Sequence, residues 1–164
     1  MKRFAVSTLV TLGVIALIFW FITRPGTLGR DEMPPHIPDL VNGASMFHAG
    51  ACASCHSLPG SEEDEPYLLG GGHEIKTDFG LFRVPNISPD PETGIGDWST
   101  GEFVNAMRNG VSPSGSHYYP AFPYTSYSRM HLEDVLDLKN YLDTLPPVDN
   151  RVAGHELGFP WNIR

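Results

Sequence analysis

The chain has 164 residues, 18% of them charged, with 17 glycines and 15 prolines, so it has room for about one domain that is rich in loops. Beyond residue 38 it carries 17 acidic and 7 basic residues, a formal balance of −10. That sign excludes nucleic acid as a partner, because binding to phosphates requires cations. A chain this rich in loops is easier to fold when a large apolar group supplies part of its core.

Residues 1–23 are predicted to form a transmembrane signal anchor. Lys2 and Arg3 precede 19 residues, 4–22, that carry no charge, and such a helix spans a hydrocarbon core of about 30 Å. The bulky Trp20 and Phe21 offer no small-residue cleavage site, which disfavours a removed signal peptide. The basic residues keep the amino end in the cytoplasm, so the rest faces the periplasm across a bacterial inner membrane. A buried core helix is the other alternative.

Residues 24–38 contain four prolines and two glycines, a composition typical of a semi-rigid tether. Asp39 is the predicted N-cap of a helix that carries Phe47 and ends at Gly50. We expect Gly43 to let a partner helix approach this helix closely.

The stretch Gly50-Ala-Cys52-Ala-Ser-Cys55-His56 holds the only two cysteines of the chain. A C-x-x-C pair followed by histidine is the attachment pattern of a c-type haem. Cys52 and Cys55 can each add to one haem vinyl group, and His56 is then placed under the iron as its proximal ligand. The motif predicts one covalently attached haem c.

Three other interpretations compete for this motif. A thioredoxin-like C-x-x-C requires a βαβ surround, which the sequence does not show, and has no use for the adjacent histidine. A structural zinc site needs four ligands, and the remaining histidines are irregularly spaced. A disulfide across C-x-x-C closes too short a loop to stabilise much.

Between residues 58 and 97 five prolines and the run Gly70-Gly71-Gly72 predict loops and no helix. The acidic run 62–65 is expected to be a solvated loop face. Packing against the edge of a haem would order a loop segment of this length. Arg83 and Trp98 are each candidates for a hydrogen bond to a haem propionate or for ordinary packing.

Two helices are predicted after this segment. Ser99-x-x-Glu102 is a capping box that starts a helix ending at Gly110. A final helix over about residues 132–145 carries a leucine-rich stripe and stops at two prolines. We expect this stripe to pack against the helix that carries Phe47.

A haem iron that shuttles electrons needs a second axial ligand besides His56. Met130 is the predicted distal ligand, because it lies 74 residues later in a loop just before the final helix. Met46 is too close to the cysteines, and Met107 is expected to pack in its short helix. His117 and His131 stand near Met130 and remain alternatives.

In these residues and motifs the chain resembles class I c-type cytochromes. More narrowly it resembles the membrane-bound cytochrome c subunits that accept electrons from periplasmic alcohol, aldehyde and related dehydrogenases. The resembling stretches, within about residues 39–148, are 43–56, Pro85-Asn-Ile-Ser-Pro-Asp-Pro-Glu-Thr-Gly-Ile-Gly-Asp-Trp-Ser, Gly115-Ser-His-Tyr-Tyr-Pro-Ala-Phe-Pro-Tyr-Thr-Ser-Tyr and the final helix. The resemblance implies an all-α haem domain with long loops, and electron transfer from a dehydrogenase to a downstream cytochrome or oxidase of the respiratory chain.

Two departures from the family matter. Many relatives carry methionine where this chain has Phe122, which cannot bind iron and so moves the expected ligand to Met130. Relatives also carry two or three such domains, whereas residues 149–164 read as a tail, either a partner surface or the trace of a lost domain. The rival function is a haem domain with an open or weak sixth site that acts on peroxide or binds a gas, with His117 as its nearby acid or base.

Overall fold

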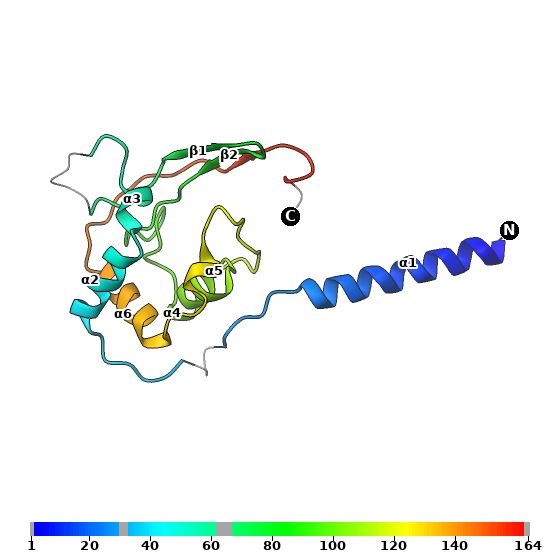
Figure 1. The fold of residues 1–164 in the computed structure, drawn as a ribbon, viewed down its shortest axis with the longest axis horizontal. Helices are drawn as coiled ribbons and strands as arrows, with labels where there is room; N and C mark the ends of the chain where they lie inside the picture. The colour runs from blue at the N-terminus through cyan, green and yellow to red at the C-terminus, as the bar shows by residue number, and fades with distance from the viewer. Residues whose placement is uncertain (1, 30–32, 62–66, 163–164) are drawn as a thin grey trace.

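The computed structural model describes residues 2–29, 33–61 and 67–162. Within them the elements are, in chain order, α1 (Lys2–Thr23), α2 (Leu40–Ala49), α3 (Cys52–His56), β1 (Glu74–Thr77), β2 (Gly80–Arg83), α4 (Thr100–Val104), the π-helical turn η2 (Asn105–Asn109), α5 (Tyr124–Tyr127), α6 (Leu132–Leu142) and β3 (Glu156–Leu157). Figure 1 shows α1 projecting away from the body that the other elements form. The acidic loop face expected at 62–65 lies outside the described residues.

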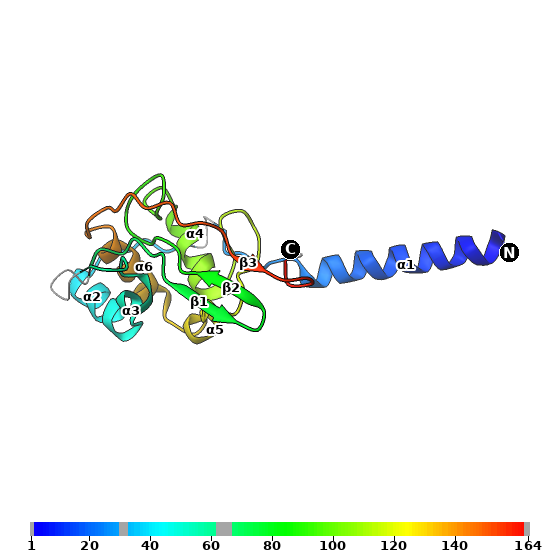
Figure 2. The same ribbon diagram turned by 90° about the horizontal axis from the view of Figure 1, so that it is seen from above.

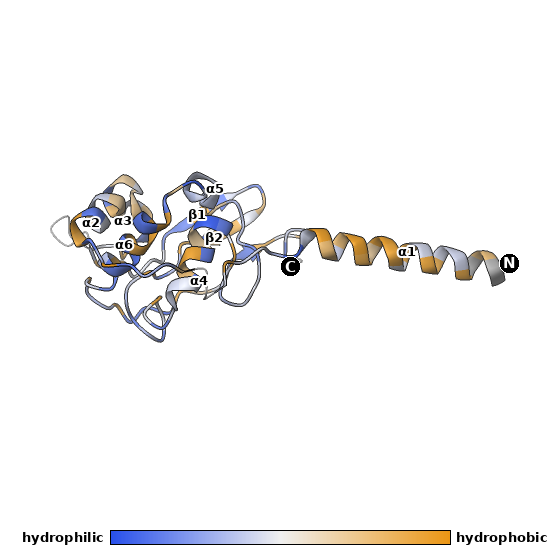
Figure 3. Cartoon of the chain, turned by 90° about the horizontal axis from the view of Figure 1, so that it is seen from below, coloured by the Kyte–Doolittle hydropathy of each residue, from blue (hydrophilic) through white to orange (hydrophobic). Residues whose placement is uncertain are grey.

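Helix α1 is long and apolar enough to cross a membrane, as a signal sequence near an N-terminus also would be. Its 22 residues make a helix of about 33 Å. None of the residues from Val6 to Thr23 is buried against the rest of the protein, and Figure 3 shows hydrophobic colour along the helix. An exposed apolar surface of this kind is unfavourable in water, so an apolar environment would stabilise α1.

The core of the domain lies between α2 and α6. Phe47 on α2 is 1% exposed and packs with the apolar stripe of α6, which comprises Val135, Leu136, Leu138 and Leu142. The two helices approach closely at Gly43, where an added Cβ would lie 2.3 Å from the carbonyl oxygen of Asp137. The predicted pairing of these two helices and the close approach at Gly43 are both confirmed.

Helix ends follow the predicted capping residues. The Asp39 carboxylate accepts hydrogen bonds from the backbone N–H groups of Val41 and Asn42, at 2.9 and 3.0 Å. Ser99 and Glu102 form the expected reciprocal capping box at the start of α4, which continues into η2 and ends at Gly110 with φ 63°. Helix α6 ends at Leu142, three residues before the predicted end.

The segment expected to form loops contains β1 and β2, which belong to a small antiparallel sheet of order β1-β2-β3. The hairpin turns at residues 78–79, and Gly80, the first residue of β2, has a φ of 128° that suits glycine. Strand β3 adds to β2 from near the end of the chain. Figures 1 and 2 show the hairpin along one side of the domain, its tip toward the side from which α1 leaves. The expectation of an all-α domain is therefore not confirmed, although no helix occurs between residues 67 and 97, as predicted.

The loop after β2 is held by its own polar side chains. Asn86 is 4% exposed and donates to the carbonyl oxygen of Val148 at 2.7 Å, while its own side-chain oxygen accepts from the N–H of Ser88. Asp90 accepts from the N–H and the hydroxyl of Thr93, both at 2.7 Å, and these hydrogen bonds lower the pKa of Asp90. The loop thus has an internal scaffold besides anything that it packs against.

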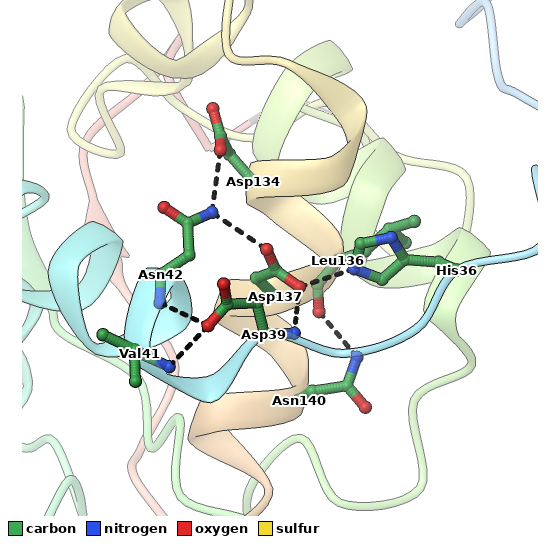
Figure 4. A network of polar contacts seen from close by, with 8 residues as sticks. All are labelled: His36, Asp39, Val41, Asn42, Asp134, Leu136, Asp137 and Asn140. Atoms are coloured by element: carbon green, nitrogen blue, oxygen red, sulfur yellow. Dashed lines mark hydrogen bonds and ion pairs between the residues drawn. The ribbon is translucent and has the colours of Figure 1, made fainter.

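The proline-rich segment after α1 lies against the domain at two points. Leu28 exchanges two backbone hydrogen bonds with the side chain of Asn105 on η2. Farther along, His36 Nε2 lies 2.5 Å from Asp137 Oδ1, and the N–H of Asp39 donates to the same oxygen at 2.8 Å (Figure 4). Asn42 of α2 completes the network with hydrogen bonds to Asp134 and Asp137 on α6.

Candidate functional site

The cysteine motif forms a single helical turn, α3, directly after α2. The chain turns between the two helices at Ala51, which adopts the left-handed conformation with φ 51°, uncommon for a residue with a Cβ. Residues three positions apart share one face of a helix, so Cys52 and Cys55 present their sulfurs on the same side. Both thiols are free, Cys52 half-buried and Cys55 exposed.

The Cys52 thiol is protonated at neutral pH. Burial raises its pKa to about 11, more than a backbone hydrogen bond lowers it, and the charge of Cys55 raises it further. A redox-active C-x-x-C lowers the pKa of a cysteine instead. The raised pKa therefore gives no support to the redox alternative. In thioether formation the sulfur bonds one carbon of a vinyl group and the hydrogen goes to the other.

His56 is oriented by the loop that follows β2. Its Nδ1 lies 2.8 Å from the carbonyl oxygen of Pro85, and because a carbonyl only accepts, Nδ1 carries the proton and Nε2 keeps its lone pair. Although part of the ring is exposed, the surrounding protein lowers the pKa of His56 by burial, which outweighs the opposing effect of the hydrogen bond. A neutral imidazole whose second nitrogen is fixed in this way is the usual metal-binding arrangement of histidine.

Gly71 places Pro85 beside His56. Its N–H donates to the carbonyl oxygen of His56 at 2.8 Å, and its φ is 66°. A Cβ on Gly71 would lie 2.4 Å from the carbonyl carbon and oxygen of Pro85. The glycine run, predicted only as a turn, thus allows the contact that holds the imidazole.

One side chain of α5 reaches the stretch that carries the cysteine motif. The Tyr127 hydroxyl donates to the carbonyl oxygen of Gly50 at 3.2 Å. Burial raises the pKa of Tyr127, and the charges of Cys52 and Cys55 raise it further, so the phenol lies near both thiols. Tyr124 of the same helix packs on Gly110, which joins α5 to the end of η2.

Met130 is half-buried in the turn between α5 and α6. Its backbone N–H donates to the carbonyl oxygen of Tyr127 at 3.0 Å. Its side chain packs against the same core that Cys52 and Ala53 contact. Phe122 also packs against this core. Met130 and the cysteine motif therefore contact the same hydrophobic core.

The other predicted candidates for the sixth ligand occupy different places. His117 is exposed and its Nε2 lies 3.3 Å from the carbonyl oxygen of Thr23 at the end of α1. His131 is exposed at the start of α6. Met107 is buried in the core on η2, and Met46 is half-buried against it on α2.

The two arginines nearest to these elements differ in their partners. Arg83 donates to Glu74, Glu156 and the carbonyl oxygen of Gly154, at 3.2, 2.6 and 2.6 Å, so its guanidinium is already engaged. Arg108 on η2 has a buried Nε that finds no hydrogen-bond partner among the described residues.

Two thiols on one helix face, a neutral imidazole with a free Nε2 and an unpaired guanidinium match a porphyrin that offers two vinyl groups, an iron and carboxylates. In the described part of the chain, no three His, Cys, Asp or Glu side chains gather as metal ligands, so the zinc alternative gains no support. The donor set fits a covalently attached haem.

The sequence analysis missed four contributors to this region, namely Gly71, Tyr127, the carbonyl group of Pro85 and Arg108. Gly71 and Tyr127 were noticed as part of a turn and of a resembling stretch, without a role. The hydrogen bond to Pro85 joins residues 29 positions apart, and no local pattern signals it. Nothing in the sequence marked Arg108 as a half-buried cation whose Nε lacks a partner.

Comparison with known proteins places these observations in a family. The family model described as "Cytochrome c" matches residues 40–146. The chain is 43% identical, over all of its length, to a protein named "Diheme cytochrome c-type" of Cereibacter sphaeroides, of which it covers 55%.

Two further relatives are named as subunits of dehydrogenases. The chain is 35% identical to the fructose dehydrogenase cytochrome subunit of Gluconobacter japonicus, over 79% of this chain and 26% of the relative. It is 36% identical to the cytochrome c subunit of the quinone alcohol dehydrogenase of Gluconacetobacter polyoxogenes, over 76% of this chain and 26% of the relative. The chain thus spans about half of the diheme relative and about a quarter of the other two. The resemblance inferred from the motifs is confirmed, and this chain belongs to the cytochrome c family.

Proposed function

We propose that residues 39–148 form a monohaem c-type domain that transfers electrons. Cys52 and Cys55 hold one haem c by thioether bonds, His56 is the proximal iron ligand and Met130 the distal one. The observation that carries the proposal is the 2.8 Å hydrogen bond from His56 Nδ1 to Pro85, beside two cysteines on the same helical turn. The motif occurs once in residues 1–164, which is the basis for a single haem in this stretch.

The haem supplies a ferric/ferrous couple, and the chain's residues set its surroundings. The carbonyl of Pro85 keeps the imidazole of His56 in one tautomer and orientation. The thioether of Met130 is soft and neutral, so it favours ferrous iron and raises the reduction potential relative to a second histidine. No observation among the described residues favours the rival function on peroxide or a gas, since His117 is exposed and lies against the end of α1.

The electron donor in this proposal is a periplasmic dehydrogenase, and the acceptor is a downstream cytochrome or oxidase of the respiratory chain. The names of the relatives, which are cytochrome subunits of fructose and alcohol dehydrogenases, support the donor. Residues 1–23 act as an uncleaved single-pass anchor in the inner membrane, with residues 24–38 as tether and 149–164 as tail. The exposed apolar surface of α1 supports the anchor.

A redox assay in native membranes tests this function. On addition of alcohol, fructose or gluconate, we expect the haem of this chain to be reduced, which shows as growth of the ferrous α-band. Membranes that carry the Cys52→Ser, Cys55→Ser double variant are the control and should lack the added band. The proposed donor class is wrong if none of these substrates reduces the haem while a chemical reductant does.

A second experiment tests the distal ligand. Met130→Ala should convert a low-spin ferric spectrum into one with an open or water-bound sixth site, because alanine offers no ligand. Met46→Ala is the matched control, since Met46 is also half-buried against the core. An unchanged low-spin spectrum in Met130→Ala would show that another group binds the iron.

A further inference from the structure

Arg108 stands apart from the other cations of the domain. Its Nε is buried without a hydrogen-bond partner, and none of the described residues forms an ion pair with its guanidinium. The other half-buried or buried basic side chains are paired: Arg83 with two glutamates and Lys139 with Asp143. The remaining described lysine and arginines after residue 38 are exposed, namely Lys76, Arg129 and Arg151.

A buried guanidinium nitrogen without a partner is costly. Leaving a buried donor unsatisfied destabilises the folded state, and more so when the group is charged. The chain has a surplus of acidic residues beyond residue 38, yet none of the described carboxylates turns to Arg108. The missing partner is therefore best sought in a group that the polypeptide does not itself provide.

The position of Arg108 relates it to the cysteine motif. Its neighbour Met107 lies in the core that Cys52 and Ala53 contact. Helix α5 packs on η2 and also reaches the cysteine motif, through the hydroxyl of Tyr127 on Gly50. The turn that carries Arg108 thus lies on the same core as Cys52, and it packs on the helix whose Tyr127 reaches Gly50.

We propose that Arg108 binds a propionate carboxylate of the covalently attached haem. This inference rests on the proposed function, because the propionate arrives with the haem. An arginine and a carboxylate form charge-assisted hydrogen bonds, often two in parallel, which would satisfy the buried Nε. Arg108 is a positioning residue that fixes the macrocycle at its carboxylate edge, while Cys52 and Cys55 fix it at its vinyl groups.

The pairing has a predictable effect on the reduction potential. A cation beside the propionate offsets the negative charge that the propionate places near the iron. The ferric state is then less favoured, and the reduction potential rises. The ionisable side chains on the elements packed against η2 are otherwise engaged or neutral: Glu102 in the capping box, and the phenols Tyr124 and Tyr127. The propionate is then the group whose ionisation changes when Arg108 is removed.

Redox titration of the full-length haem protein in detergent tests the inference. Arg108→Gln should shift the ferrous-to-ferric ratio at a fixed potential about tenfold toward ferric, which is 59 mV for one electron. Its potential should also rise as the pH is lowered through the range where the freed propionate takes up a proton. Arg129→Gln removes an exposed charge of the same sign and should change neither property.

Arg108→Lys keeps the charge without the fork and should lie between wild type and Arg108→Gln. If Arg108→Gln does not acquire haem, the potential can still be measured in Arg108→Lys. Low-frequency resonance Raman spectra should show a shifted propionate bending band in both Arg108 variants. The inference is overturned if Arg108→Gln or Arg108→Lys retains haem but matches Arg129→Gln in potential, pH dependence and propionate band. A wild-type protein without covalent haem would instead refute the proposed function.

Discussion

Replacing Gly71 by alanine tests how the loop holds His56. The residue has a φ of 66°, and its N–H donates to the carbonyl of His56. A Cβ would lie 2.4 Å from the carbonyl carbon and oxygen of Pro85, which is the acceptor for His56 Nδ1. Because these are backbone atoms, no side-chain rotation relieves the overlap, and the loop must move away.

The cost has two main parts. The left-handed conformation costs a residue with a Cβ about 1 kcal/mol. Overpacking against fixed atoms costs about 2 kcal/mol, in the middle of the usual range. We therefore expect Gly71→Ala to lower the free energy of unfolding by about 3 kcal/mol. The displaced Pro85 carbonyl should also make the imidazole a poorer donor to iron, which destabilises the ferric state and raises the reduction potential.

Guanidinium unfolding followed by circular dichroism measures the first effect, and redox titration the second. Gly60→Ala is the matched control, because Gly60 has a φ of 83° but nothing within 4 Å of its Cβ position. It should lose only about 1 kcal/mol and keep the wild-type potential. If Gly71→Ala is no less stable than Gly60→Ala, the contact between Gly71 and Pro85 does not hold the loop as we argue.

Three further substitutions and one control, Gly101→Ala, probe the scaffold. Gly43→Ala should cost about 2 kcal/mol, because its Cβ meets Asp137 and Tyr141, whereas Gly101→Ala, with open space, should gain about 0.5–1 kcal/mol in unfolding experiments. Burial acts to raise the pKa of Asp137, but hydrogen bonds from Asn42, Asp39 and His36 outweigh it and lower the pKa. Asp137 therefore stabilises the fold above the unfolded carboxyl pKa of about 3.9, and this contribution is lost as the pH falls through the lower folded pKa. Asp137→Asn should flatten the acid limb of a stability-pH curve; an unchanged limb would contradict this. Ser99→Ala should lose about 1 kcal/mol by removing the cap, and equal stability would show that the capping box is dispensable.

The parts of the fold that were predictable are those with short-range signals. Ser99 and Glu102 reveal the start of α4 because both capping bonds lie within four residues. The 3.6-residue periodicity of α6 and the helix carrying Phe47 indicate two apolar faces that need each other. C-x-x-C-H indicates its chemistry because thioether attachment and iron binding restrict residue type and spacing together.

The sheet was missed because its signal is weak. β1 and β2 have four residues each, and β3 has only two, from the distant end of the chain. The strand β2 is held by Arg83 contacts to residues 154 and 156, which no local pattern shows. The proline-rich loop was expected to depend on the haem, yet Asn86 and Asp90 organise much of it by their own hydrogen bonds.

Long-range polar pairing was the least predictable feature. No local pattern distinguishes Asp137 from the other acidic residues of α6, but it is 4% exposed and binds His36, about 100 positions earlier. The segment predicted as a tether is therefore held against the domain at its far end. The contact of Tyr127 with Gly50 and the unpartnered Nε of Arg108 likewise depend on residues far apart in the sequence, so no local pattern predicts them.

The mass of the mature protein tests the central claim most directly. We expect intact-protein mass spectrometry, with peptide mapping of the segment around Cys55, to find one haem joined through both Cys52 and Cys55. Cys52→Ser and Cys55→Ser together should yield the polypeptide without the added mass. Mature material from cells competent in haem attachment that carries two free thiols and no haem would contradict the account.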